Sequence, residues 1–295
     1  MASSAPVIEV ANLSKSYGDV QAVRDISFTI DPGESVAILG PNGAGKTTTI
    51  EILEGYRTKS GGSVRVLGID PEKAGANWRA KIGIVLQQPG AFEEVTITEL
   101  LNQVAAYYPH PRPVSETIAA VGLTPQAETR LAKLSGGQRR RVDVALGIIG
   151  DPQVLFLDEP TTGFDPEARR EFWDLIRSLT AEGTTILLTT HYLDEAEHLS
   201  DRAIVIAHGT LIADCPLPEL GGPEARTPLV RWQDDDGPHE VRTEDPGQVV
   251  YDLHGSRQYR DLEVIRPGLE DIYLSLLRAA NGSDVTNVAS SQEAS

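Results

Sequence analysis

The chain has 295 residues and a formal net charge of −17, from 43 acidic and 26 basic side chains. Such an excess of negative charge repels phosphate backbones and anionic membrane surfaces, so we expect no nucleic-acid partner. The single cysteine, Cys215, has no partner for an internal disulfide, which is typical of a reducing cytosol. Residues 1–6 lack the apolar stretch of a signal peptide, and no run of about 20 apolar residues predicts a membrane span. If a membrane is involved, we expect another chain to cross it.

The first 214 residues alternate short β-branched runs with helical patterns, which predicts an α/β fold. The runs are Val7–Val10, Val36–Leu39, Ile82–Val85, Val154–Leu157, Thr185–Thr189 and Ala203–Ala207. Val36–Leu39, Val154–Leu157 and Ile186–Leu188 are apolar almost throughout. Strands that are buried on both faces of a parallel sheet have this composition, so we expect these three at the centre of the core sheet.

A glycine-rich loop follows the run Val36–Leu39. The P-loop pattern fits Gly40, Pro41, Asn42, Gly43, Ala44, Gly45, Lys46, Thr47 and Thr48, and a helical run comes next. Glycines let backbone N–H groups surround phosphate oxygens, and the helix start adds positive potential. Lys46 offers a charge to the β- and γ-phosphates, and the Thr47 hydroxyl can ligate Mg²⁺. A chance match is the alternative, but the strand before the loop and the helix after it favour a nucleotide site.

Between about residues 88 and 150 the strand signal stops, and a helical insertion is expected. Thr98–Tyr108 and Ser115–Val121 have helical patterns, with a proline cluster between them. A third helical run follows Leu134-Ser-Gly-Gly-Gln138. Ser135 is suited to be its N-cap, and two glycines expose the first backbone N–H groups to an anion. Taken alone, these residues fit an ordinary helix cap better than a second phosphate site.

The run Val154–Leu157 ends in two carboxylates, Asp158 and Glu159. Central strands of a parallel sheet end at the edge where ligands bind. Asp158 is therefore expected to hold Mg²⁺, directly or through water, and Glu159 to act as the general base on the attacking water. An ordinary exit from strand to loop would also explain the pair, but a P-loop in the same chain favours catalysis.

The order of these motifs resembles one family. LSGGQ behind a P-loop and shortly ahead of FLDEP is similar to the nucleotide-binding subunits of ABC transporters, over about Val7 to Asp214. The resemblance implies an ABC ATP-binding domain over residues 7–214, with a P-loop cassette fold: a parallel core sheet, an antiparallel N-terminal β-subdomain and the helical insertion. It also implies that two cassettes pair head to tail. Ser135, Gly136, Gly137 and Gln138 of one copy would then contact the ATP held by the other.

Four further positions match the family. Tyr17 resembles the aromatic residue that stacks on adenine, although a surface tyrosine would look the same. Gln87, with Gln88 beside it as an alternative, resembles the glutamine that contacts Mg²⁺ or the attacking water and links the site to the membrane partner. His191 resembles the histidine that hydrogen-bonds the γ-phosphate. Asp165 resembles a carboxylate at the dimer seam and is also suited to be a helix N-cap.

The composition changes after Cys215. A linker rich in proline and glycine is followed by short alternating segments near Leu229–Trp232, Val249–Leu253 and Leu262–Ile265, which favour strands, and by a helical pattern over Leu269–Ala280. We expect a small α+β accessory domain over residues 215–280. Residues 281–295 are small and polar, so a disordered tail is expected.

Gly268–Leu276 resembles the C-terminal helix of drug-resistance, ABC-2 type exporter ATPases. The resemblances imply an ATP-binding and ATP-hydrolysing subunit, most simply a homodimer, that powers a separate permease for drugs or other hydrophobic compounds from the cytoplasmic face of the membrane. DNA-repair ATPases would need a long coiled coil between the P-loop and LSGGQ. Ribosome-binding cassette proteins have two cassettes in one chain with basic connecting segments, whereas this chain has one P-loop and is acidic. An adenylate-binding fold without transport is the third alternative.

Overall fold

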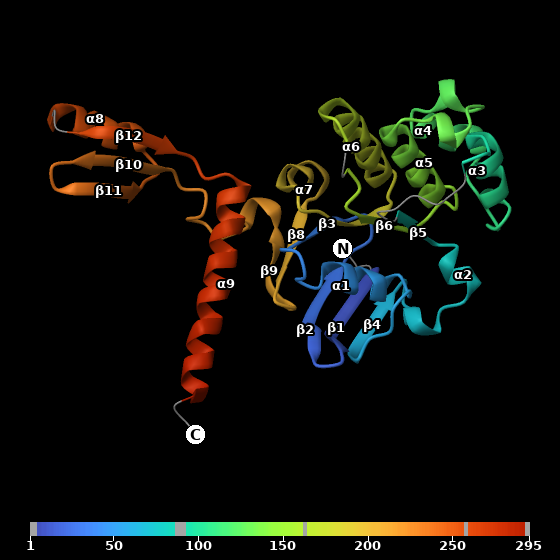
Figure 1. The fold of residues 1–295 in the computed structure, drawn as a ribbon, viewed down its shortest axis with the longest axis horizontal. Helices are drawn as coiled ribbons and strands as arrows, with labels where there is room; N and C mark the ends of the chain where they lie inside the picture. Colours follow the sequence, from blue (N-terminus) through green and yellow to red (C-terminus); the bar gives the residue numbers. More distant parts are fainter. Residues whose placement is uncertain (1–4, 86–92, 162–163, 257–258, 293–295) are drawn as a thin grey trace. The chain divides into compact units, whose positions relative to one another are not determined.

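The structure is a computed structural model that describes residues 5–85, 93–161, 164–256 and 259–292. The chain divides into two compact units, Met1–Asp214 and Cys215–Ser295. Each unit has sheets and helices of its own (Figure 1). Among the helices in the described part of the chain, none has both the length and the hydropathy needed to cross a membrane.

One layer of the N-terminal unit is a three-stranded antiparallel sheet in the order β2-β1-β4. Its strands are β1 Ile8–Tyr17, β2 Val20–Ile30 and β4 Gly61–Val66. β1 and β2 form a hairpin in which Tyr17 pairs with Val20. One face of this sheet is buried, as alternating apolar residues dictate, and it contributes Ile8, Val10, Leu13, Val23, Ile26, Phe28 and Val64 to the core.

The second layer is a six-stranded sheet in the order β5-β6-β7-β3-β8-β9. Its strands are β3 Ser35–Leu39, β5 Ile82–Val85, β6 Val154–Asp158, β7 Thr185–Thr189, β8 Arg202–Ala207 and β9 Thr210–Pro216. The strands from β5 to β8 in this order are paired in parallel. The predicted parallel sheet is confirmed, and the three apolar strands β6, β7 and β3 lie inside it. β9 returns through a turn at His208 and Gly209, and both residues have positive φ, which suits a two-residue hairpin turn.

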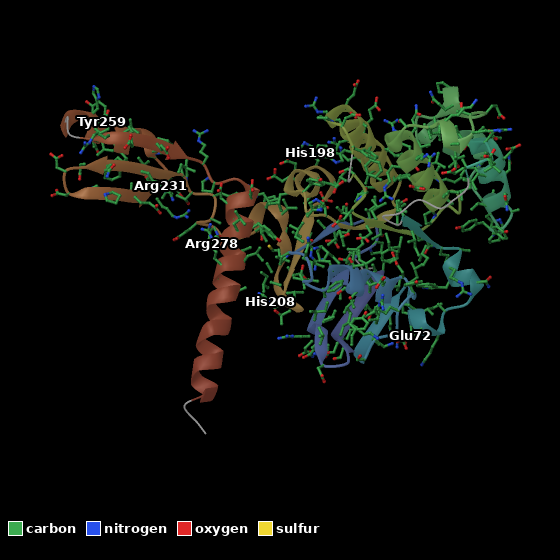
Figure 2. All side chains as sticks on the ribbon, in the orientation of Figure 1. Glu72, His198, His208, Arg231, Tyr259 and Arg278 are labelled. Carbon is green, nitrogen blue, oxygen red and sulfur yellow. The ribbon has the colours of Figure 1, made fainter. Side chains whose placement is uncertain are left out.

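Helices cover the face of the core sheet that lies away from the antiparallel sheet, and α1 lies on the opposite side (Figure 1). Side chains fill the space between these layers (Figure 2). The helices of this unit are α1 Lys46–Leu53, α2 Ala76–Arg79, α3 Ile97–Ala105, α4 Val114–Ala120, α5 Gly136–Ile148, α6 Pro166–Ala181 and α7 Leu193–Leu199. α3, α4 and α5 occur between β5 and β6 along the chain, where the insertion was expected, and lie together in Figure 1.

The C-terminal unit contains an antiparallel sheet in the order β11-β10-β12 and two helices. Their bounds are β10 Leu229–Asp234, β11 Gly237–Arg242, α8 Pro246–Ser256, β12 Arg260–Ile265 and α9 Leu269–Gln292. Leu229 and Val230 of β10 and Leu269 and Ile272 of α9 are buried. The unit therefore has a small apolar centre.

One expectation for the C-terminal unit is wrong, the strand near Val249–Leu253. Val249–Leu253 lies in α8, because Asp245 caps this helix by accepting a hydrogen bond from the Gln248 backbone N–H at 3.0 Å, and Pro246 is its first residue. An Asp-Pro helix start thus outweighs a short apolar run. α9 is drawn from Leu269 to Gln292, and the disordered tail expected for residues 281–295 stays a prediction.

Candidate active site

The predicted P-loop connects β3 to α1, and close packing of the backbone requires glycine at two of its positions, Gly40 and Gly45. A Cβ atom at Gly40 would lie 2.2 Å from the carbonyl oxygen of Ile206. At Gly45, where φ is 104°, it would lie 2.5 Å from the carbonyl oxygen of Ala22. Neither position can hold a larger residue without moving the neighbouring strand. The loop is therefore held in one shape by β2 and β8.

Lys46 is the first residue of α1, and its side chain lies across the loop. The ammonium group donates to the carbonyl oxygens of Gly40, at 2.7 Å, and Pro41, at 3.1 Å. The residue is 6% exposed, and burial lowers the pKa of the ammonium group, while the carboxylates of Glu159 and Asp158 raise it. The P-loop and the acidic end of β6 therefore belong to one electrostatic cluster. Thr47, in the first turn of α1, is exposed.

The two carboxylates at the end of β6 have different partners. Asp158 accepts a hydrogen bond from the hydroxyl of Thr189, its neighbour in the β6–β7 register. Glu159 has a left-handed backbone, with a φ of 44°, and its N–H donates to the carbonyl of Thr189 at 3.1 Å. Its carboxylate oxygen Oε1 lies 3.3 Å from Nδ1 of His191, in the loop after β7. The structure thus brings together Lys46, Asp158, Glu159 and His191, which were predicted from separate motifs.

A left-handed backbone at a residue other than glycine is uncommon, and such positions cluster at functional sites. At Glu159 this geometry turns the chain directly after the Asp158 carboxylate. One carboxylate consequently faces β7 and the next one faces His191. That separation suits two different tasks for two adjacent acids, metal binding for one and proton transfer for the other.

The LSGGQ segment forms the start of α5. Ser135 is the N-cap, and its hydroxyl accepts a hydrogen bond from the Gln138 N–H at 3.2 Å. The Gln138 side chain accepts in return from the Ser135 N–H at 3.0 Å. This is a capping box, so the predicted N-cap is confirmed. Ser135 and Gly136 are exposed, and Gly137 is half-buried.

The start of α5 lines a hollow of about 580 Å³ together with the start of α6. Asp165 lies on this hollow and caps α6, since its carboxylate accepts from the N–H groups of Glu167, at 3.0 Å, and Ala168, at 2.8 Å. The N-cap role predicted for Asp165 is therefore confirmed, and the structure places it beside the signature residues. Its role at a dimer seam stays a prediction.

Sequence reasoning missed Arg140, which connects α5 to the acidic end of β6. Its guanidinium group donates to the carbonyl oxygens of Pro160, at 2.9 Å, and Asp158, at 3.0 Å. Burial lowers the pKa of Arg140 and raises that of Asp143, which lies 3.8 Å from it, to about 6. In the sequence Arg140 stands in a run of three arginines, Arg139–Arg141, which looks like a solvated helix face.

The other predicted site residues are Tyr17 and Gln87, with Gln88 as the alternative to Gln87. Tyr17 ends β1 and is 40% exposed, and the cationic groups of Lys15 and Arg57 lie 5.1 and 5.2 Å from its ring centre. A nucleotide base can reach such a ring, but stacking on adenine stays a prediction. Gln87 and its alternative Gln88 lie outside the described residues.

A P-loop, a paired carboxylate and histidine, and a capped helix start on an α/β sheet define a P-loop ATPase. The ABC transporter family matches residues 23–162. The chain is 40% identical to a Nod factor export ATP-binding protein I of Rhizobium johnstonii, over 93% of this chain and 96% of that one. It is 36% identical to the protein of the same name in Paraburkholderia xenovorans, over 91% and 96%.

The solved structures agree with this result. An ATP-binding subunit of an ABC transporter superposes with a TM-score of 0.66 and 28% identity, over 72% of this chain and 91% of that one. A dimeric cassette in a post-hydrolysis state, bound to ADP and Pi, has the same fold, with a TM-score of 0.64 and 24% identity over 71% and 98%. The chain belongs to the ATP-binding subunits of ABC transporters, a family of ATP-hydrolysing transport subunits. The predicted family, fold class and ATPase activity are confirmed.

Proposed function

We propose that this chain hydrolyses ATP with Glu159 as general base and powers an exporter through a separate membrane permease. The observation that supports the chemistry is the contact of 3.3 Å between Glu159 and His191, in the same cluster as the P-loop lysine. A carboxylate in this position can take a proton from the attacking water. The histidine holds that carboxylate with Nδ1 and presents Nε2 to the γ-phosphate, and both nitrogens donate when the ring is protonated.

Lys46 has the geometry to bind the β- and γ-phosphates. Its ammonium group donates to two neutral loop carbonyls. Phosphate oxygens are stronger acceptors for this ammonium group, because they carry negative charge and the carbonyl oxygens do not. The backbone N–H groups of residues 43–48 would surround the same phosphates, and the first turn of α1 adds its positive dipole end. Gly40 and Gly45 leave no room for a side chain, because backbone carbonyls of β8 and β2 lie against them.

The donor set at the end of β6 fits Mg²⁺, which prefers oxygen ligands. Asp158 would supply a carboxylate oxygen and Thr47 a hydroxyl, and Gln87 is the further ligand that the sequence suggests. Mg²⁺, when bound, neutralises charge on the β- and γ-phosphate oxygens. The hydroxyl of Thr189 donates to Asp158 and would hold the carboxylate in its ligating orientation.

Two copies are proposed to close head to tail around two ATP molecules. The start of α5, with Ser135, Gly136, Gly137 and Gln138, offers the N–H groups of its two glycines and the Ser135 hydroxyl to a phosphate held by the other copy. Asp165 lies on the same hollow and would sit at the seam. A homodimer has two identical sites, which is the simplest closed arrangement.

The direction of transport is proposed from the relatives. The proteins named for Nod factor export are similar over more than nine-tenths of this chain, so the similarity includes the C-terminal unit. We propose that this chain lies at the cytoplasmic face of the membrane, bound to an ABC-2 type permease. The cargo of that permease would be hydrophobic or amphipathic. Drug or antibiotic efflux rests only on the resemblance of Gly268–Leu276 to exporter ATPases.

The base is tested by Glu159→Gln. Because glutamine cannot accept the proton, kcat is expected to fall by about 10²-fold or more, while ATP affinity changes little. Steady-state hydrolysis and titration with a fluorescent ATP analogue measure the two quantities. Glu197→Gln, on the exposed side of α7, is the matched control and should keep full activity. Full turnover in Glu159→Gln would contradict the assignment of the base.

The ATP-loaded Glu159→Gln protein also tests the pairing. Without hydrolysis the closed state should persist, so size-exclusion chromatography with light scattering should show twice the mass of one chain. Transport requires a further measurement: co-purification with the permease, and ATPase activity that rises when a cargo is added to the reconstituted complex. A chain that hydrolyses ATP but binds no permease would contradict the transport role and leave the catalytic assignment intact.

A further inference from the structure

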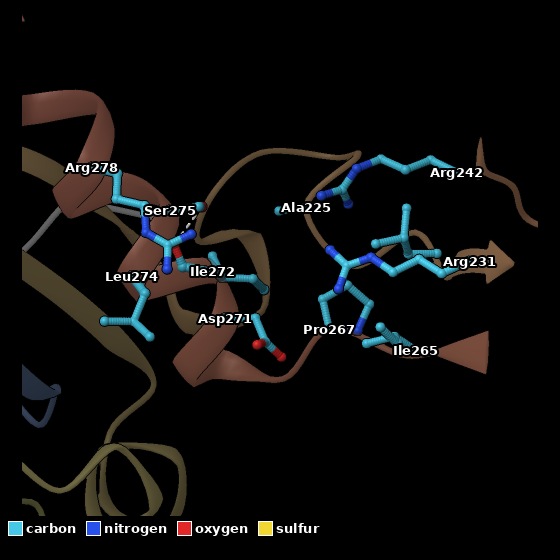
Figure 3. Close-up of a pocket in the computed structure, with 11 residues that line it drawn as sticks. Ala225, Arg231, Arg242, Ile265, Pro267, Asp271, Ile272, Leu274, Ser275 and Arg278 are labelled. Carbon is cyan, nitrogen blue, oxygen red and sulfur yellow. Dashed lines mark hydrogen bonds between the residues drawn. The ribbon is translucent and has the colours of Figure 1, made fainter. Parts of the chain in front are cut away.

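The C-terminal unit contains a pocket of about 230 Å³ that the ATPase mechanism does not use. It lies between the sheet β11-β10-β12 and the first turns of α9 (Figure 3). Its wall is partly apolar, because Leu229 and Ile272 are 4% and 2% exposed and Ile265 and Pro267 are half-buried. An apolar wall of this kind favours a ligand with a hydrophobic body.

Three guanidinium groups line the same pocket, and each comes from a different element. Arg231 belongs to β10, Arg242 to β11 and Arg278 to α9. Figure 3 shows Arg231 and Arg242 reaching into the pocket from the sheet and Arg278 facing them from the helix. Residues 215–295 carry only 7 basic side chains against 15 acidic ones, so a convergence of three arginines is not a property of this unit's average surface.

The arginines keep hydrogen-bond donors for a ligand. A guanidinium group has five N–H donors. Arg231 uses Nε for Glu240 at 2.8 Å, and Arg242 uses one N–H for the carbonyl oxygen of Glu224 at 3.4 Å. The one acid that lines the pocket, Asp271, accepts a hydrogen bond from the backbone N–H of Gly268 at 3.0 Å, at the start of α9. The pocket therefore has more positive than negative charge, next to an apolar wall.

We propose that this pocket binds an organic oxyanion, a carboxylate or a phosphate ester, that carries a short apolar body. Arginine forms paired N–H bonds to the oxygens of such groups. The volume is below the 300–1,000 Å³ that is common for drug-sized ligands, so the pocket fits a short molecule or the anionic end of a longer one. A soluble metabolite and an anionic lipid share this chemistry.

The test uses the full chain and isothermal titration calorimetry with octyl phosphate and with octanoate. Octanol has the same apolar body without charge, and vesicles that contain phosphatidylglycerol present the oxyanion on a membrane. Wild-type protein is expected to bind an anionic probe and not octanol. Arg278→Gln should weaken that binding by about tenfold or more, and Arg231→Gln with Arg278→Gln should abolish it.

Arg260→Gln is the matched control, since Arg260 is an exposed arginine of the same sheet that does not line the pocket. It should change the affinity by less than about twofold. Basal ATPase activity should be unchanged in all these variants, and circular dichroism and thermal unfolding check that the C-terminal unit of each variant is folded. Binding of the soluble probes identifies a small-molecule site, and binding of vesicles alone, with the same loss in Arg278→Gln, identifies a lipid site.

The proposal is overturned if no anionic probe binds, or if the probes bind equally well after both arginines are replaced. Equal binding of octanol would also overturn it, because the pocket would then be only apolar. Each of these results can be obtained with full ATPase activity, so failure of this proposal is distinct from failure of the proposed catalytic function.

Discussion

The carboxyl group of Glu54, at the C-terminal end of α1, contributes to the pH dependence of the free energy of unfolding. Glu54 is 8% exposed, and burial, reinforced by the negative charges of Asp158 and Glu51, raises its pKa to about 8. The folded protein therefore favours the protonated form. Its contribution to stability is complete below the ordinary pKa of about 4.5 and is lost as the pH rises through about 8.

Glu54→Gln should remove this loss, because glutamine stays neutral. In urea unfolding of the nucleotide-free protein, we expect the variant to exceed the wild type by about 2–4 kcal/mol at pH 8.5 and to differ little at pH 5. Glu116→Gln, an exposed position on α4, is the control for the change in net charge. A difference between Glu54→Gln and wild type that does not vary with pH would contradict the prediction.

At the same scale, sequence reasoning found the residues with a motif and missed those that act through burial. Lys46, Asp158, Glu159 and His191 each follow a strand or open a helix in a recognisable pattern, and the structure places them together. Glu54 and Arg140 carry no such pattern. Their importance comes from the exclusion of water, which depends on which elements cover them and cannot be deduced from neighbours in the sequence.

Among the elements, α5 is connected to the end of β6 by the side chain of Arg140. Arg140, on the helix capped by Ser135, donates to the carbonyl oxygens of Asp158 and Pro160, the residues on either side of Glu159. The two elements are therefore joined by a planar, bidentate group. Lysine has the same charge but cannot donate to both carbonyls from a fixed fork.

Arg140→Lys is expected to destabilise the fold by about 1–3 kcal/mol, because a buried carbonyl loses its partner. It should also lower kcat, since the loop at Glu159 is less well held. Thermal unfolding and steady-state hydrolysis measure the two effects. Arg139→Lys is the adjacent control, because Arg139 is half-buried and its carboxylate neighbour Glu93 lies 4.0 Å away. Equal behaviour of the two variants would contradict the role given to Arg140.

How well an element could be predicted from the sequence depends on how it is buried. Strands enclosed on both faces, such as β6 and β7, were found within one residue of their bounds. β2, β4 and β11 were not predicted individually, because strands with one wet face alternate and contain turn-forming residues. In α8, an Asp-Pro start was overlooked in favour of a short apolar run.

At the scale of the whole molecule, the ATPase residues belong to one compact unit. The P-loop, the acidic end of β6, His191 and the signature residues all lie within Met1–Asp214, which has its own core. A chain that ends at Pro216, the last residue of β9, should therefore bind a fluorescent ATP analogue within about threefold of the full chain. Loss of nucleotide binding in a truncated chain that circular dichroism shows to be folded would contradict this independence.

The capping box at the start of α5 also restricts the orientation of the Ser135 hydroxyl hydrogen. The Ser135 oxygen already accepts from the Gln138 N–H, so the orientation of its hydroxyl is restricted before any other molecule arrives. The Ser135 O–H can then donate a hydrogen bond to a ligand, next to the N–H groups of Gly136 and Gly137, which are also donors. The start of α5 therefore presents mainly donors, the Ser135 O–H and the N–H groups of Gly136 and Gly137, and favours ligands rich in acceptors over cations.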